Sequence, residues 1–149
     1  MEDDYANHME LRLAESADLE RLIAVDPIAG RDPSRRSFLE SSTRRGECWL
    51  AESSGTPVGF VVLQYSFYGH GFVALVVVDI SARRRGVGRR LLEHAASVCT
   101  TPKLFTSTNA SNTAMRSLLS HVGFEPSGAI HNLDPGDAEL VYVRRRESA

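Results

Sequence analysis

Phe72-Val73-Ala74-Leu75-Val76-Val77-Val78 is a continuous apolar and β-branched run near the middle of a chain of 149 residues. It is too short for a buried helix and has the length of a strand, so it predicts a central strand that is covered on both faces. The segment Arg83-Arg84-Arg85-Gly86-Val87-Gly88-Arg89-Arg90 follows, and apolar residues then recur at helical spacing as far as Cys99. Residues 72–99 therefore predict a strand, a glycine turn and a helix with one apolar face.

A strand, a glycine turn and a helix in this order can bind an anion. The first amides of a helix have no partners within it and carry the positive end of its dipole, so phosphate oxygens can bind them. Gly86 and Gly88 lack Cβ atoms, which lets a bulky diphosphate approach the main chain. Five arginines between Arg83 and Arg90 add positive charge at the same end.

The turn resembles the diphosphate motif of the GNAT superfamily of acyl-CoA-dependent N-acyltransferases. That motif is Arg or Gln, two residues, Gly, one residue, then Gly or Ala, and Arg83, Gly86 and Gly88 match it. A second match begins at Asn112, which is followed eleven and twelve residues later by Gly123-Phe124. The resemblance covers Phe72 to Phe124, and outside that span only the order of elements supports it.

The resemblance implies a single α/β (α+β) domain over residues 1–149 with the GNAT fold. Such a domain has a mixed, mostly antiparallel sheet of about seven strands with about four helices on both faces. The patterns along the chain predict strands at 9–14, 47–52, 58–65, 72–78, 103–108, within 124–131 and at 139–144. They predict helices that begin after Ser16, at Asp32-Pro33, after the glycine turn and after Ser111, with Gly123 ending the last. The mostly polar first seven residues predict a loose segment.

In the family, the cosubstrate is acetyl-CoA, and its pantetheine lies where the central strand and the next one splay apart. The resemblance implies that main-chain groups of Val76, Val77 and Val78 bind it, and that one amide there stabilises the charge on the thioester oxygen. It assigns the diphosphate to Arg83, Arg84, Arg85, Gly86, Val87, Gly88 and Arg89. Asn109 and Asn112 would contact the cofactor from the far side, although Asn112 is equally explained as a helix-start residue that bonds local amides.

Two positions depart from the family. Many members have a tyrosine seven residues after the motif's asparagine to protonate the departing thiolate, and Leu119 stands there. Many also have a glutamate on the central strand, and Ala74 stands at the equivalent place. The proton-transfer candidates that remain are Asp79, His70, His121 and Tyr142, besides water, and the sequence does not choose among them.

The acceptor is expected to be an amine, on a small molecule or a peptide. Asp134 and Asp137, with Glu139 beside them, lie in a predicted loop that borders the acceptor cleft in the family, so they are expected to attract a cationic amine. Turn formation around Pro135-Gly136 explains the two aspartates equally well. A homodimer is compatible with the sequence.

Composition and motifs favour this function over several others. The formal charge is -2, so nucleic-acid or membrane binding is not expected, and a nucleic-acid role for Arg83 to Arg90 remains a weaker alternative. No Gly-Lys-Ser/Thr triplet follows Gly88, and Leu91 replaces the third glycine of a dinucleotide fingerprint. The second alternative is a CoA-binding module without catalysis, which the missing tyrosine and glutamate would suit.

The remaining expectations concern thiols, metals and location. Cys48 and Cys99 have no paired spacing for metal or redox chemistry, so both are expected to be reduced, buried thiols, and no metal is expected. The acidic start, Met1 to Asp4, lacks the features of a signal peptide, and no 18-residue apolar run occurs. A cytoplasmic protein is the expectation.

Overall fold

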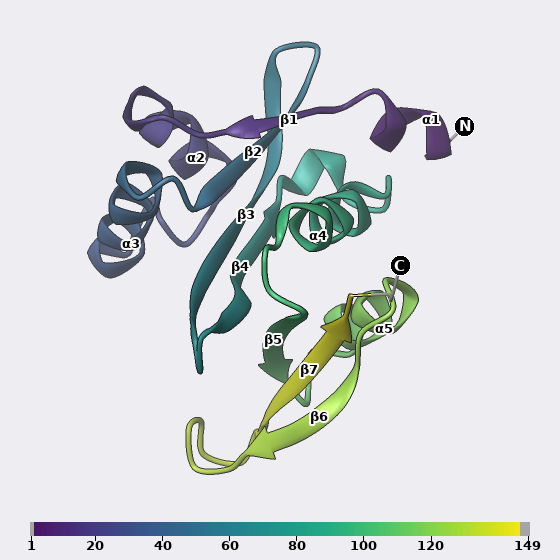
Figure 1. Cartoon of the computed structure of the whole chain (residues 1–149). Coiled ribbons are helices and arrows are strands. Elements are labelled where there is room, and N and C mark those ends of the chain that lie inside the picture. Colours follow the sequence, from purple (N-terminus) through teal and green to yellow (C-terminus); the bar gives the residue numbers. More distant parts are fainter. Residues whose placement is uncertain (1, 147–149) are drawn as a thin grey trace.

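One mixed sheet forms the centre of the structure, a computed structural model that describes residues 2–146. Its strands within that range are β1 (Glu10–Leu13), β2 (Cys48–Ser53), β3 (Thr56–Phe67), β4 (His70–Val78), β5 (Lys103–Asn109), β6 (Glu125–Ile130) and β7 (Glu139–Arg145). Their order across the sheet is β1-β2-β3-β4-β5-β7-β6 (Figure 1). Every neighbouring pair is antiparallel except β4 and β5, which are parallel. The predicted mixed, mostly antiparallel sheet of seven strands is confirmed.

Helices cover both faces of this sheet. Among residues 2–146 they are α1 (Glu2–Asn7), α2 (Leu19–Val25), α3 (Pro33–Arg44), α4 (Val87–Val98) and α5 (Thr113–His121), besides the short 3-10 helices η1 (Ser16–Asp18) and η2 (Ile80–Ala82). Figure 1 shows α2 and α3 on one side of the sheet and α4 and α5 on the other. Leu91 and Leu119 lie in the core on the α4 and α5 side, and Leu22 and Leu39 lie in the core on the opposite side.

The amino-terminal segment differs from the prediction. Residues 2–7 form α1 instead of a loose segment, so that prediction was wrong for them, and residue 1 lies outside the described range. Ala6 and Met9 are buried in the core beneath α4, and the Tyr5 ring lies 4.8 Å from the Arg85 guanidinium carbon. Because burial of these side chains depends on a helix about 80 residues later in the chain, local sequence patterns did not indicate it.

The start of α5 also differs in detail. Ser111 was expected to cap this helix, but the side chain of Asn112 does so and accepts a hydrogen bond from the Met115 amide at 3.1 Å. This bond confirms the explanation of Asn112 as a helix-start residue. Gly123 ends the helix with a φ of 90°, as predicted, because a glycine adopts the left-handed conformation at little cost.

A bulge interrupts β4 at Ala74. Val73 is opposite Leu63 on β3 and Leu75 is opposite Val62, so β4 has one residue more than its partner between the two pairs. Ala74 and Leu75 consequently pack toward the same core, on the α2 and α3 side. The bulge shifts the alternation of main-chain groups along the rest of β4.

Candidate functional site

β4 and β5 are joined only at one end. Their pairing runs from Gly71 opposite Leu104 to Val73 opposite Thr106, although β4 continues to Val78. The Oγ1 atom of Thr106 donates a hydrogen bond to the Val73 carbonyl oxygen at 2.9 Å, where the pairing ends. Beyond that point the facing edges of the two strands have no ladder bonds between them, so an opening begins at the Ala74 bulge.

Alternation of the main-chain groups shows which part of β4 faces this opening. The Asp79 amide donates to the Val58 carbonyl at 2.8 Å, so Asp79 faces β3. Along a strand, the main-chain N–H and C=O groups of residues two apart point to the same side. Those of Val77 therefore point toward β3 as well, and those of Val76 and Val78 point into the opening. A Cβ on Gly59 of β3 would lie 2.7 Å from the Val77 oxygen, which agrees with this direction. The expected set of three valines is therefore reduced to Val76 and Val78 as main-chain donors to the opening.

The glycine turn lies just past the end of β4. Gly86 precedes the first residue of α4 with a φ of 81°, a left-handed conformation that favours glycine. Its carbonyl accepts the hydrogen bond of the Arg90 amide at 3.0 Å, the first bond of the helix ladder. The amides of Val87, Gly88 and Arg89 precede that bond and can therefore bind an oxyanion at the positive end of the helix.

Gly88 has a second reason to be glycine. A Cβ there would lie 3.1 Å from Leu118 Cδ2 and 3.6 Å from Val78 Cγ2, so its absence lets α4 pack closely on α5 and β4. Replacement of Gly88 would thus disturb packing as well as any anion bound at the turn.

The arginines of the turn surround a hollow of about 520 Å³ beside α1. Arg84, Arg85, Arg89 and Arg90 contribute to its lining. Arg83, Arg84 and Arg85 are exposed, and Arg89 is paired with Glu93 at 2.8 Å. The turn therefore presents guanidinium groups next to the free amides.

The side chain of Asn109 is hydrogen-bonded to two carboxylates of the same chain. Its amide nitrogen donates to Asp134 at 2.9 Å and to Glu139 at 3.1 Å. Asn112 uses its side-chain oxygen to cap α5. Contact of either asparagine with the cofactor stays a prediction.

Three of the four candidates for proton transfer lie away from the end of the β4–β5 pairing. His70 begins β4, three residues before Val73 and so about 10 Å from it, with its ring 5.7 Å from the ring of Phe105. Asp79 caps η2 and accepts hydrogen bonds from the amide and hydroxyl of Ser81. His121 is the exposed last residue of α5, with Nδ1 2.7 Å from the Ser117 oxygen.

Tyr142 lies at the level where the two strands separate. It is opposite Thr106 in the β5–β7 pairing, and its side chain is buried on the α5 side of the sheet. Its hydroxyl accepts a hydrogen bond from Arg116 Nε at 3.4 Å. Leu119, which stands where many family members have tyrosine, is only 1% exposed and packs in the same core.

The acidic residues stand at the far end of β5, beyond its pairing with β4. Glu139 is opposite Asn109 and accepts from Ser107 Oγ at 2.7 Å. Asp137 accepts from both the amide and the hydroxyl of Ser111, and its own amide donates to the Asp134 carbonyl at 3.1 Å. These bonds show that Asp134 and Asp137 organise the loop, in agreement with the explanation that the two aspartates form a turn around Pro135-Gly136.

Comparison with known proteins decides the family. The family model of the acetyltransferase (GNAT) family matches residues 14–124. The chain belongs to the GNAT acetyltransferase family. A GNAT-family acetyltransferase from Bacillus cereus ATCC 10987 is 30% identical, with 94% of this chain and 99% of that chain covered and a TM-score of 0.87. No curated protein sequence gives a significant match.

More distant structures share the GNAT fold. The ribosomal-protein-S18-alanine N-acetyltransferase from Escherichia coli is 21% identical, with coverage of 95% of this chain and 96% of that chain and a TM-score of 0.78. YncA from Salmonella typhimurium, solved with its cofactor acetyl-CoA, is 17% identical, with 96% of each chain covered and a TM-score of 0.72. At these identities the likeness is one of fold.

Among the described residues, no three potential metal-binding side chains group together, and no helix has the length and apolarity to cross a membrane. Cys48 and Cys99 are both free and buried, as predicted.

Proposed function

We propose that this GNAT protein transfers the acetyl group of acetyl-CoA to a primary amine. The observation that carries the proposal is the opening between β4 and β5, which begins at the Ala74 bulge and leads to the glycine turn. The diphosphate binds the amides of Val87, Gly88 and Arg89, and the pantetheine extends along Val78 and Val76. The family and its acetyl-CoA-bound neighbours support this arrangement.

The reaction needs little from side chains. The amine nitrogen attacks the thioester carbon, a C–N bond forms, and negative charge develops on the carbonyl oxygen, where the Val76 amide donates a hydrogen bond. The C–S bond then breaks and the thiolate leaves. Because an alkyl thiol has a pKa of about 8.5, the thiolate departs readily and takes up a proton that the new ammonium group releases.

Of the four proton-transfer candidates, Tyr142 is the one at the level where β4 and β5 separate, and we assign it the passing of this proton. It lies opposite Thr106, across β5 from the end of the β4–β5 pairing. The test is Tyr142→Phe, with Tyr65→Phe as the matched loss of a hydroxyl elsewhere on the sheet. We expect kcat to fall about 100-fold or more for Tyr142→Phe alone. Equal turnover of the two variants would assign the proton transfer to water.

The acceptor is expected to carry positive charge near the reacting amine. Asp134 and Glu139 converge on Asn109 at the end of β5, beyond its pairing with β4. Asp134→Asn should raise the KM for a cationic amine and leave the KM for acetyl-CoA unchanged. If Asp134→Asn lowers the melting temperature without changing the acceptor KM, Asp134 has a role in loop structure alone. Asp137→Asn serves as the comparison variant, because Asp137, in the same loop as Asp134, accepts a hydrogen bond from the Ser111 amide.

The alternative function is a CoA-binding module without catalysis, which Leu119 and Ala74 favour. Both functions predict that acetyl-CoA raises the melting temperature, because a ligand of the folded state stabilises it by mass action. Only the enzyme releases CoA in proportion to an acetylated amine, as measured by thiol assay and mass spectrometry over a panel of amines and amino-terminal peptides. Stabilisation without CoA release across the panel would support the alternative.

A further inference from the structure

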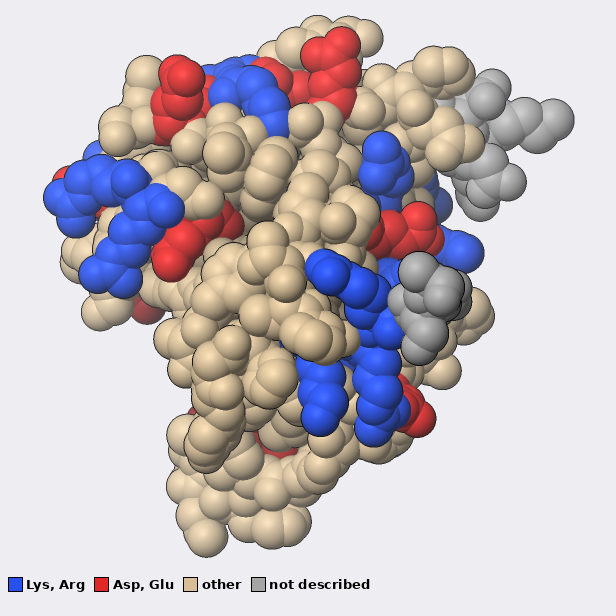
Figure 2. Space-filling model, viewed as in Figure 1, with Lys and Arg blue, Asp and Glu red and all other residues tan. Residues whose placement is uncertain are grey.

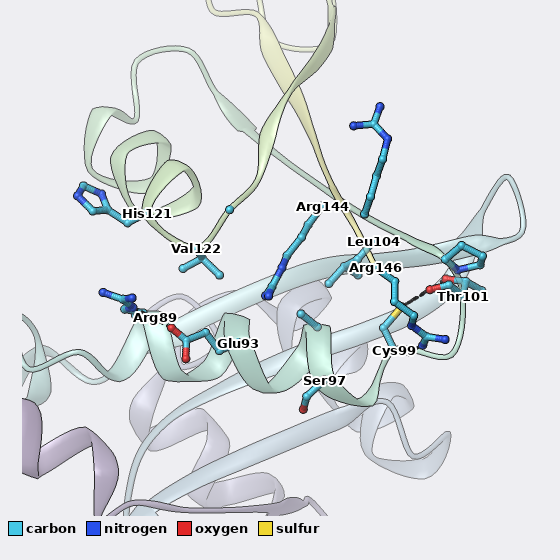
Figure 3. A pocket seen from close by; sticks show the side chains of 14 residues that line it. Arg89, Glu93, Ser97, Cys99, Thr101, Leu104, His121, Val122, Arg144 and Arg146 are labelled. Atoms are coloured by element: carbon cyan, nitrogen blue, oxygen red, sulfur yellow. Dashed lines mark hydrogen bonds and ion pairs between the residues drawn. The ribbon is translucent and has the colours of Figure 1, made fainter. Parts of the chain in front are cut away.

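A groove of about 780 Å³ lies between α4, the end of α5 and the end of β7 (Figure 3). Its size is that of a small-molecule site. Ala96 is one of its lining residues, eight positions after Gly88 on α4, which places the middle of the groove about 12 Å from the glycine turn. Arg89 lines the end of the groove nearest the turn. Arg144 lies at the other end, opposite Leu104, which is opposite Gly71 at the closed end of the β4–β5 pairing. The Arg144 end of the groove is therefore separate from the opening between β4 and β5.

The lining of the groove is strongly basic. It includes Arg89, Arg144, Arg145 and Arg146, and Glu93 is its single acidic member among the described residues. In Figure 2, Lys and Arg side chains gather below α4 on this face of the molecule. The whole chain has a formal charge of -2, so this charge is local.

Three of these arginines have partners. Arg89 is paired with Glu93, and Arg145 with Glu125. Arg146 donates to the Cys99 carbonyl at the end of α4, where a cation compensates the negative end of the helix dipole. Helix capping and surface pairing therefore explain all but one of the four.

Arg144 is the exception. Its side chain extends from β7 into the space between α4 and α5 (Figure 3). The residue is half-buried, and among the described side chains, those of residues 5–146, its Nη1 atom has no hydrogen-bond partner and no acidic group is paired with it. A guanidinium nitrogen that is buried without a partner is costly, and an anion in the groove would compensate it.

We propose that this groove binds a phosphate group, free or carried by a small molecule, with Arg144 as its anchor. A planar guanidinium suits bidentate binding of phosphate oxygens, and the neighbouring arginines favour a dianion over a single carboxylate. The site goes beyond the acetyl-transfer function, because its anchor Arg144 lies at the closed end of the β4–β5 pairing, away from the turn amides that we assign to the diphosphate.

The test measures binding of inorganic phosphate and of glucose 6-phosphate to the full chain by calorimetry, with and without saturating acetyl-CoA. We expect a Kd of about 1 mM or tighter for at least one probe. Acetyl-CoA should leave this Kd unchanged. Tighter binding of inorganic phosphate assigns the site to the free ion, and tighter binding of glucose 6-phosphate assigns it to a phosphorylated small molecule.

Arg144→Gln should weaken binding of the tighter probe at least tenfold, whereas Arg45→Gln, just after α3, removes the same charge and should leave binding unchanged. Arg144→Lys keeps the charge but loses the planar fork, so it should weaken binding several-fold even if Arg144→Gln fails to fold. The proposal is overturned if neither probe binds, if the Arg144 variants bind as the wild type does, or if acetyl-CoA displaces the probe.

Discussion

The Thr106 hydroxyl donates a hydrogen bond to the Val73 carbonyl oxygen at 2.9 Å, at the last position where β4 and β5 are paired. Thr106 is buried, so this bond between the two strands is shielded from water. This bond marks the boundary between the closed part of the sheet and the opening to which we assign the acetyl donor.

Thr106→Val should therefore lower the free energy of unfolding by about 0.5–1.5 kcal/mol, because it removes a buried hydrogen bond. Urea unfolding measures the change. Thr108→Val is the control, since Thr108 is also buried and lies two residues further along β5. Equal losses of unfolding free energy for the two variants would show that the hydrogen bond to Val73 does not contribute measurably to stability.

Charge reversal at the glycine turn should weaken acetyl-CoA binding. Arg84→Glu with Arg85→Glu places two negative charges beside the amides of Val87 and Gly88, so the Kd should rise at least tenfold, about 1.4 kcal/mol. Calorimetry at low salt measures it, and added salt should reduce the difference.

The matched control for that experiment is the double variant Arg44→Glu with Arg45→Glu, which changes the net charge equally at the end of α3. An equal loss of affinity in the control would mean that only overall charge matters. Gly88→Glu is a poorer test, because a Cβ there would also press on Leu118.

Asp18 gives the stability a defined pH dependence. Hydrogen bonds from Arg12, with both distances 2.9 Å, outweigh burial and hold the pKa of this carboxyl well below its usual range. A lowered pKa in the folded state means that the stabilisation is present above the unfolded pKa of about 4 and is lost as the pH falls below it.

Asp18→Asn should accordingly cost about 1–2 kcal/mol at pH 7, allowing for the partial exposure of the arginines, and progressively less below pH of about 4. Urea unfolding across pH measures this. Glu20→Gln, which removes an exposed pair with Arg36, should change the free energy by less than about 0.5 kcal/mol. A loss for Asp18→Asn that is independent of pH would contradict the electrostatic explanation.

Cys48 should be inert in the folded protein. Burial, together with the nearby negative charge of Asp18, raises the pKa of its thiol to about 12, and only a thiolate reacts at a useful rate. A thiol reagent at pH 8 should modify neither Cys48 nor the buried Cys99 until denaturant is added, and then both. Fast modification of Cys48 under native conditions would show that β2 opens readily.

Trp49 should report the protonation of His94. The two rings are 4.5 Å apart, and burial with the charge of Arg90 lowers the pKa of His94 below its usual 6.5. A protonated imidazole quenches indole emission. The fluorescence of this single tryptophan should therefore fall as the pH is lowered, with a midpoint below pH 6.5. The transition should be absent in His94→Gln, and its persistence there would assign it to another group.

Much of the fold could be predicted because its signals are local. The run Phe72 to Val78, the glycine turn and the apolar face of α4 each lie within one segment, so periodicity and glycine chemistry were enough. The order of the remaining strands and helices followed from similar patterns together with the family resemblance.

The features that escaped prediction depend on residues far apart in the chain. The Ala74 bulge, and with it the direction of Val77, is set by pairing with β3. The α1 helix depends on burial of Ala6 beneath α4. The position of Arg144 between two helices depends on tertiary packing, and no spacing in the sequence indicates it.

The most direct test of the central claim is a titration of the isotopically labelled protein with acetyl-CoA, followed through its backbone amide NMR signals. The opening between β4 and β5 predicts the largest shifts at Val76 and Val78 and at the turn amides of Val87, Gly88 and Arg89. Val77, whose amide faces β3, should shift less than its two neighbours. Shifts confined to other surfaces, or no shifts at saturating acetyl-CoA, would contradict the assignment of this opening as the acetyl-donor site.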